Sequence, residues 1–207
     1  MPELQRILDA LYDYPVGEQL SDNRDQYLTN WGFTIYRTYY GPSSDENWNT
    51  LLATAKKEAD EELLTCGDDN IAKKLQPLFR LDARSDASLL DGVGLRGLCK
   101  IYKDKIGGAP MPTHETSVFL VADEHVLNQI GQGNFIVKAV DADEPPPEDA
   151  FSNEGGKEMY WGWMRMQTRQ LLELWGMLEI CAAYMCITWA VHNEDLDSMI
   201  WEGGDAD

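Results

Sequence analysis

The sequence predicts an α+β protein with a mainly antiparallel sheet of about four strands and with helices largely on one face of that sheet. Three observations lead to this prediction. Segments with the period of two typical of strands occur among amphipathic segments with helical spacing. Their order along the chain is helix, strand, helices, three strands and a last helix. The length of 207 residues, 43% of them hydrophobic, suits one core, so we treat residues 1–207 as a single domain.

The clearest strand and the clearest helix follow each other near the start of the chain. In residues 31–40, Phe33 and Ile35 alternate with polar or amphipathic residues, which predicts a strand with one buried face. Ser43 and Glu46 stand three residues apart, the spacing of a capping box in which each side chain bonds the backbone amide of the other residue. We therefore expect a long amphipathic helix to begin at this pair.

Shorter and less regular segments lie on both sides of these two elements. Residues 4–11 have apolar side chains at helical spacing and predict a short helix. After the long helix, Asp68 or Asp69 is placed to cap another short helix. Residues 79–86 are dense in charge and predict an irregular segment, whereas residues 88–106 predict a helix that three glycines weaken.

The remaining strands and the end of the chain follow. Residues 116–122, 135–141 and 160–166 predict three strands, the first of them buried on both faces. A proline triplet and a diglycine predict a mobile loop over residues 143–157. A long apolar helix is expected after the last strand, followed by an acidic C-terminal tail over residues 193–207.

The formal net charge of −19 limits the classes of partner. Such a field repels phosphate backbones and anionic lipid, so we expect neither nucleic acid nor a membrane as partner, while a basic protein partner stays open. The longest apolar stretch, Ile180 to Val191, has 12 residues, fewer than the roughly 20 that span a bilayer. The first residues lack the basic start and apolar run of a secretory signal, which predicts a cytoplasmic location.

No pattern in the sequence predicts a metal or a cofactor. The four cysteines are scattered, and no pair has the two-residue spacing of a zinc or redox site, so we expect reduced thiols. Gly92, Gly94 and Gly97 match the spelling of a dinucleotide-binding fingerprint. That fingerprint requires a buried strand immediately before it, and a helical pattern stands there instead. Close helix packing is therefore the expected use of these glycines.

His114 and His125 are the candidate catalytic residues. One opens the strand predicted at residues 116–122 and the other lies in the turn after it, so the two side chains can meet at one end of the sheet. A histidine near a carboxylate can act as a general base near neutral pH. The alternative is a pair of surface residues at loop ends, because no nucleophile pattern accompanies them.

Tyr36, Arg37, Arg165 and Arg169 are the candidate ligand-binding residues. The first two leave the first strand together, and the two later arginines are expected one helical turn apart. The planar guanidinium of arginine suits a carboxylate, so these residues predict a pocket for a small organic acid. The alternative is ordinary pairing of each arginine with the abundant local carboxylates.

The last third of the chain is rich in tryptophan and methionine, residue types that are enriched in interface cores. A helix that is apolar on nearly every side has to be buried, either in its own domain or against a second copy. The candidate interface residues are Trp163, Trp175, Met177, Tyr184 and Trp189.

Four blocks of the sequence are specific in combination: WGFTIYRT, FRLDARSD, VFLVAD and YWGWM. In these blocks the chain resembles a group of proteins from filamentous fungi, over about residues 30–166. The resemblance implies no activity, ligand or catalytic residue.

The function expected from these patterns is an interaction module that forms a homo-oligomer through its aromatic C-terminal helix. The alternative is a cofactor-independent enzyme or a binder of a small organic acid, with its pocket between the sheet and the helices. Enzymatic activity therefore stays open at this point.

Overall fold

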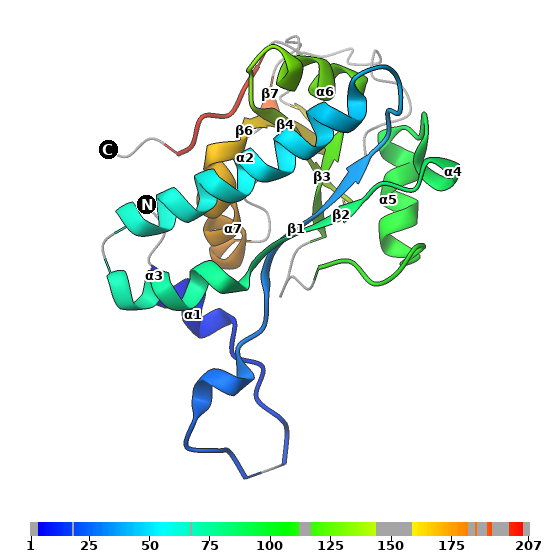
Figure 1. The fold of residues 1–207 in the computed structure, drawn as a ribbon. Coiled ribbons are helices and arrows are strands. Elements are labelled where there is room, and N and C mark those ends of the chain that lie inside the picture. The colour runs from blue at the N-terminus through cyan, green and yellow to red at the C-terminus, as the bar shows by residue number, and fades with distance from the viewer. Residues whose placement is uncertain are drawn as a thin grey trace.

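The computed structural model describes residues 4–17, 19–66, 68–111, 117–143, 159–181, 185, 190–191 and 199–204. A mixed five-stranded sheet with the strand order β2-β1-β3-β4-β6 forms its centre (Figure 1). Its strands are β1 (Trp31–Arg37), β2 (Phe79–Arg84), β3 (Val118–Ala122), β4 (Ile136–Asp141) and β6 (Trp163–Gln167). A separate pair joins β5 (Met159–Tyr160) to β7 (Ala190–Val191). The α+β class is confirmed.

The sheet is half parallel and half antiparallel, which differs from the mainly antiparallel sheet of about four strands that the sequence predicts. β1 pairs in parallel with both β2 and β3, and β3, β4 and β6 pair antiparallel. The additional strand is β2, which lies in the segment predicted to be irregular. Its outward-facing charged side chains, Arg80, Asp82 and Arg84, hide the apolar alternation of Phe79 and Leu81 on the other face.

Most helices of the described chain cover one face of the sheet, as expected. The helices on this face are α1 (Leu4–Ala10), α2 (Ser44–Thr65), α3 (Asp69–Leu75), α6 (Glu124–Gly131) and α7 (Leu171–Ile180). The opposite face is covered by α4 (Ala87–Leu90) and α5 (Leu95–Lys103). Each face therefore has its own hydrophobic cluster.

The larger cluster is centred on Trp31, whose side chain is fully buried. The Trp31 ring lies 4.6 Å from the ring of Phe79 and 5.6 Å from that of Trp175, centroid to centroid. Its indole N–H donates to the carbonyl of Leu75 at 2.8 Å. The first strand, the second strand and α7 are joined through this one side chain.

β1 is buried on both faces, so the prediction of one buried face is wrong. Phe33 and Ile35 face α2, whereas Tyr36 packs on the other side against Phe119. A strand with a neighbour on each edge and helices on each face has no solvent side, and Thr34 is only 1% exposed. Alternation with threonine and tyrosine does not reveal this, because both residue types are tolerated in a buried strand.

The start of α2 also differs from the prediction. Ser43 has a left-handed backbone with φ of 59° and makes no capping bond, so the capping box with Glu46 does not form. The hydroxyl of Ser44 instead donates to the carbonyl of Gly41 at 2.6 Å and accepts from Nη2 of Arg37 at 2.7 Å. The helix begins at Ser44 because this side chain ties it to the end of β1.

Two other helix predictions change in extent. Residues 88–106 form two helices, α4 and α5, separated by a turn in which Gly92 has a positive φ of 69° and donates its N–H to the carbonyl of Thr38 at 3.0 Å. The helix expected through Val191 ends at Ile180, because Cys181 is extended and Ala190–Val191 form a strand. The cap predicted at Asp68 is confirmed: its carboxylate accepts from the amides of Asn70 and Ile71.

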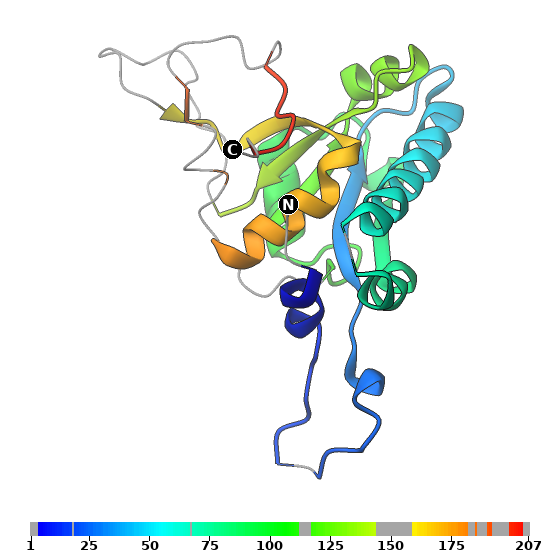
Figure 2. The ribbon, with the colours of Figure 1, turned by 90° about the vertical axis from the view of Figure 1, so that its left-hand side faces the viewer.

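The two predicted non-core segments lie largely outside the described residues. Of the loop over residues 143–157, the structure describes Asp143 alone. Of the tail over residues 193–207, it describes residues 199–204, in which Trp201 is 5% exposed and forms a parallel bridge with Met166. An arm between α1 and β1, closed at its base by the bridge between Tyr12 and Leu28, projects from the body (Figures 1 and 2).

Candidate functional site: an acidic groove between α2 and α7

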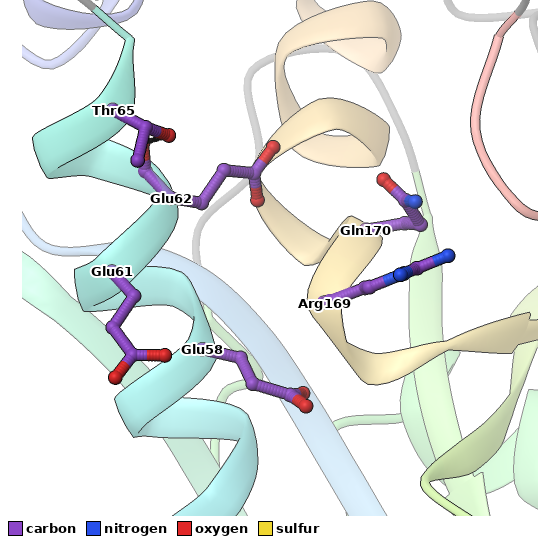
Figure 3. A pocket seen from close by; sticks show the side chains of 6 residues that line it. All are labelled: Glu58, Glu61, Glu62, Thr65, Arg169 and Gln170. Atoms are coloured by element: carbon purple, nitrogen blue, oxygen red, sulfur yellow. Dashed lines mark hydrogen bonds between the residues drawn. The ribbon is translucent and has the colours of Figure 1, made fainter.

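A hollow of about 450 Å³ lies between α2 and the turn that leads into α7 (Figure 3). We call this hollow the acidic groove. The side chains that line it are Glu58, Glu61, Glu62, Thr65, Arg169 and Gln170.

The helical repeat places the α2 residues of the groove on one face. Glu58, Glu62 and Thr65 follow one another at intervals of four and three residues, which brings their side chains to one side of a helix. The adjacent stripe of α2 contains Ala55 and Ala59, both 1% exposed, and faces the core. The core contacts of α2 therefore determine the direction in which the glutamates point.

The other wall of the groove follows directly from β6. The strand ends at Gln167 and passes through the 3₁₀ turn Thr168–Gln170 into α7. Thr168 is 1% exposed, and its hydroxyl hydrogen-bonds both the carboxylate of Glu58 and the carbonyl of Phe135. This buried threonine joins the two walls of the groove.

Glu62 is the chemically distinctive residue of the groove. Its Oε2 atom is buried and makes no hydrogen bond within the described part of the chain. Burial, followed by repulsion from Glu173, raises the pKa of the Glu62 carboxyl to about 7. The side chain therefore exchanges its proton near neutral pH, which is unusual for a glutamate.

Segment 202–204 of the chain contacts the start of α7 beside this region. Gln170 donates through Nε2 to the carbonyl of Glu202 at 2.6 Å, and the amide of Gly204 donates to Oε1 of Glu173 at 3.0 Å. Glu173 is thus held near Glu62 by a hydrogen bond to the C-terminal segment.

Among the described residues, no lysine or arginine side chain forms an ion pair with Glu62. Figure 3 shows Glu58 and Glu62 extending from α2 toward α7, whereas the Arg169 side chain points away from them. Glu61 pairs with Lys57 at 3.4 Å, but both side chains are well exposed, and such a pair contributes little. With three glutamates and one arginine, the lining of the groove is negatively charged on balance.

This arrangement suits the binding of a cationic group. A protonated amine or guanidinium can donate to the buried Oε2 of Glu62 and is attracted by the neighbouring Glu58 and Glu61. A carboxyl with a pKa near 7 can also exchange a proton with a ligand. Among the described residues, no group of three or more histidine, cysteine, aspartate or glutamate side chains is arranged to hold a metal ion.

The candidate catalytic pair cannot be followed to a common site. His114 lies outside the described residues, and His125 is an exposed residue of the first turn of α6.

The four candidate ligand-binding residues are not brought together. Tyr36 packs among the residues under α5, and burial raises the pKa of its hydroxyl to about 12. Arg37 is enclosed by the start of α2, where it pairs with Asp45 at 2.6 Å. Arg165 is a buried residue of β6, and Arg169 lies in the following turn at the acidic groove, so the two are not one helical turn apart. No pocket for an organic acid forms from this set.

The candidate interface residues differ in how deeply they are buried. Trp175 is 2% exposed and packs on Trp31, so within this chain it belongs to the core rather than to the surface. Trp163 and Met177 are half-buried, and the Trp163 ring lies 4.9 Å from Nζ of Lys138. Tyr184 and Trp189 lie outside the residues whose side chains are described.

The glycine-rich turn before α5 lines a second hollow, of about 290 Å³, at the ends of β1 and β3. Gly92 and Gly94 have open space around them, as a phosphate-binding turn would need. The carboxylates of Asp91, Asp123 and Glu124 also line this hollow and repel a pyrophosphate. Its chemistry does not fit a dinucleotide.

Sequence reasoning missed the acidic groove because it named none of the glutamates that line it as a candidate binding residue. Glu61 is exposed, but Glu62 is not, since α7 covers it. The available signal was weak: glutamates at helical spacing are usually a solvated face. Glu62 differs from Glu61 in burial only through the position of α7, which is far away in sequence.

Within the described ranges, no helix is both long enough and apolar enough to cross a membrane. Comparison of the chain with known protein families, with curated proteins and with solved structures found no match.

Proposed function

We propose that this chain is an interaction module that binds a positively charged segment of a partner protein in the acidic groove. The observation that supports this proposal is the buried Oε2 of Glu62, which lies without a hydrogen-bond partner among the described residues, beside a hollow lined by two further glutamates. Such an atom has lost its water and gains most from a donor that a ligand brings.

The charge of the whole chain supports the same class of partner. A net charge of −19 attracts basic segments over several ångströms and raises their association rate. The long side chain of lysine or arginine can then extend into the groove while its backbone stays on the rim.

Calorimetric titration with short peptides tests the proposal. At pH 8, where Glu62 is ionised, a lysine- and arginine-rich peptide should bind, and Glu62→Gln should weaken binding about tenfold or more, as expected for a hydrogen bond between charged groups. Glu46→Gln is the matched control, because Glu46 is an exposed residue of the same helix, far from the groove.

Two results would contradict this function. One is equal affinity of the Glu62→Gln variant and the unmodified chain for the basic peptide. The other is equal binding of a glutamate-rich peptide, because the groove cannot favour both charges.

Self-association through the C-terminal aromatic helix remains a separate proposal with narrower support. Trp175 is enclosed in its own core, which leaves the half-buried Met177 and the 50% exposed Ile180 as the described apolar surface of α7. Sedimentation of the Ile180→Lys variant tests this, because loss of an oligomer on this change would support the helix as the contact.

A further inference from the structure

The two edges of the central sheet differ in whether another segment of the described chain pairs with them. At the β6 edge, the amide of Trp201 donates to the carbonyl of Arg165 at 2.7 Å, and the amide of Gln167 donates to the carbonyl of Trp201 at 3.3 Å. These bonds cover that edge with the C-terminal segment. At the opposite edge, β1 is the one strand of the described chain that pairs with β2.

The backbone of β2 alternates between the paired and the open side. The carbonyl oxygen of Arg80 lies so close to Gly32 that an added Cβ on Gly32 would stand 2.0 Å from it, so this carbonyl points toward β1. By the alternation of a strand, Leu81 and Ala83 direct their N–H and C=O groups away from β1. These four groups make no backbone hydrogen bond within the described part of the chain.

An open strand edge of this kind is a template for pairing with another strand. Ala83 is exposed and Leu81 is half-buried, so solvent reaches the edge. The strand also has the length for pairing, with six residues in Phe79–Arg84.

We propose that two copies of this chain pair through β2 in antiparallel orientation, with Leu81 opposite Leu81, and so form one continuous ten-stranded sheet. In this register Arg80 of each copy stands opposite Asp82 of the other, which creates two cross-strand ion pairs. The open backbone groups of Leu81 and Ala83 are used in the pairing.

The charges of β2 distinguish this register from its neighbours. A shift that places Asp82 opposite Asp82 also sets Arg80 against Arg84, and like charges directly opposite are destabilising. A further shift pairs Asp82 with Arg84. In that register the pairing has to extend beyond Arg84, where the strand ends. The Leu81-centred register is the one that matches the charges within the observed strand.

Both partners of the ion pair are available. Arg80 is exposed, and its Nη1 donates to the carbonyl of Phe79 at 2.9 Å, which leaves the other nitrogen atoms of the guanidinium for a partner. Within its own chain, Asp82 uses Oδ2 to accept from Thr34 and Arg84. Its Oδ1 faces no hydrogen-bond donor of the described chain.

The net charge of −19 opposes any dimer, and it makes the assembly depend on salt. The repulsion between the two chains acts over longer distances than the attraction within the two cross-strand ion pairs. At about 0.15 M salt the screening length is about 8 Å, so salt weakens the repulsion more than the attraction. We therefore expect the dimer to be favoured at about this ionic strength over very low salt.

A charge-exchange experiment by sedimentation equilibrium tests the pairing. Arg80→Glu and Asp82→Lys should each weaken the homodimer about tenfold or more, because each sets two pairs of like charges opposite one another. Mixed in equal amounts, the two variants should form a one-to-one heterodimer. Glu at position 80 of one chain then faces Lys at position 82 of the other, and Asp82 of the first chain faces Arg80 of the second, as in the unmodified pairing. Arg24→Glu, an exposed arginine in the projecting arm, is the control for net charge.

A second variant separates pairing from misfolding. Ala83→Pro removes an N–H that points away from β1, so it should leave the fold intact, as measured by circular dichroism, and produce a monomer. A monomeric unmodified chain at about 200 μM and 0.15 M salt would overturn the proposal. Dimerisation that Arg80→Glu and Ala83→Pro leave unchanged would also overturn it. Neither result bears on the acidic groove, which lies on another part of the molecule.

Discussion

Replacement of Glu62 by glutamine should stabilise the fold by an amount that depends on pH. The carboxyl has a pKa of about 7 in the folded chain, against 4.5 for an ordinary glutamate. Between these two values the folded state holds a proton that the unfolded state has released, so the free energy of unfolding falls as pH rises. Below about pH 4.5 both states are protonated, and the unfavourable contribution vanishes.

The size of the effect follows from the same pKa. A rise from 4.5 to about 7 corresponds to at most about 3 kcal/mol of differential interaction, and solvent screening of a half-buried side chain reduces it to roughly 1–2 kcal/mol. Glutamine has the same shape and no charge. At pH 8 the variant should be more stable than the unmodified chain by this amount, which is about 2–8 °C in melting temperature for a chain of this length.

Urea unfolding of both chains at pH 5 and at pH 8 measures the prediction. The difference between the chains is the relevant quantity, because other groups that titrate contribute equally to both. Glu46→Gln, at an exposed position of α2, should show no such pH-dependent gain. A Glu62→Gln gain of equal size at both pH values would refute the reasoning, because it would show that the ionised carboxylate is not what destabilises the groove.

Three further changes test the fold. Gly32→Ala should destabilise the chain by more than about 2 kcal/mol in urea unfolding, because Gly32 has a φ of 127° and its Cβ would meet the carbonyl of Arg80; a neutral result would contradict the observed strand contact. Trp175→Ala should cost about 3–5 kcal/mol by the same assay, and a loss below 1 kcal/mol would place this residue outside the core. Trp201→Ala should raise amide hydrogen exchange at Gln167, and unchanged protection would show that Trp201 does not cover this edge.

The sequence predicts helices and strands well where one periodicity dominates. α1, α2 and the buried β3 match their predicted segments, and Asp68 caps α3 as expected. The prediction fails at β2, where a charged outer face hides a strand that pairs with β1. It also fails at the end of α7, because an apolar run does not show whether its residues continue as a helix or pair as a strand.

The candidate sites show a similar limit. Tyr36 and Arg37 are neighbours in sequence, yet β1 directs them to opposite faces of the sheet, and each is taken up by a different set of contacts. Glu62 becomes distinctive only because α7 returns to cover it from more than one hundred residues away along the chain. Spacing along one element cannot predict contacts of this kind.

The position of β1 between β2 and β3 has a consequence for the time at which it folds during synthesis. Ile35 pairs with Leu120, which follows it by 85 residues, so a ribosome that adds about 5–20 residues per second makes β1 wait roughly 4–17 s for this neighbour. Throughout that interval the apolar segment around Trp31 is exposed to solvent, because the sheet that buries it is incomplete. The nascent chain is therefore expected to depend on chaperones until β3 has emerged.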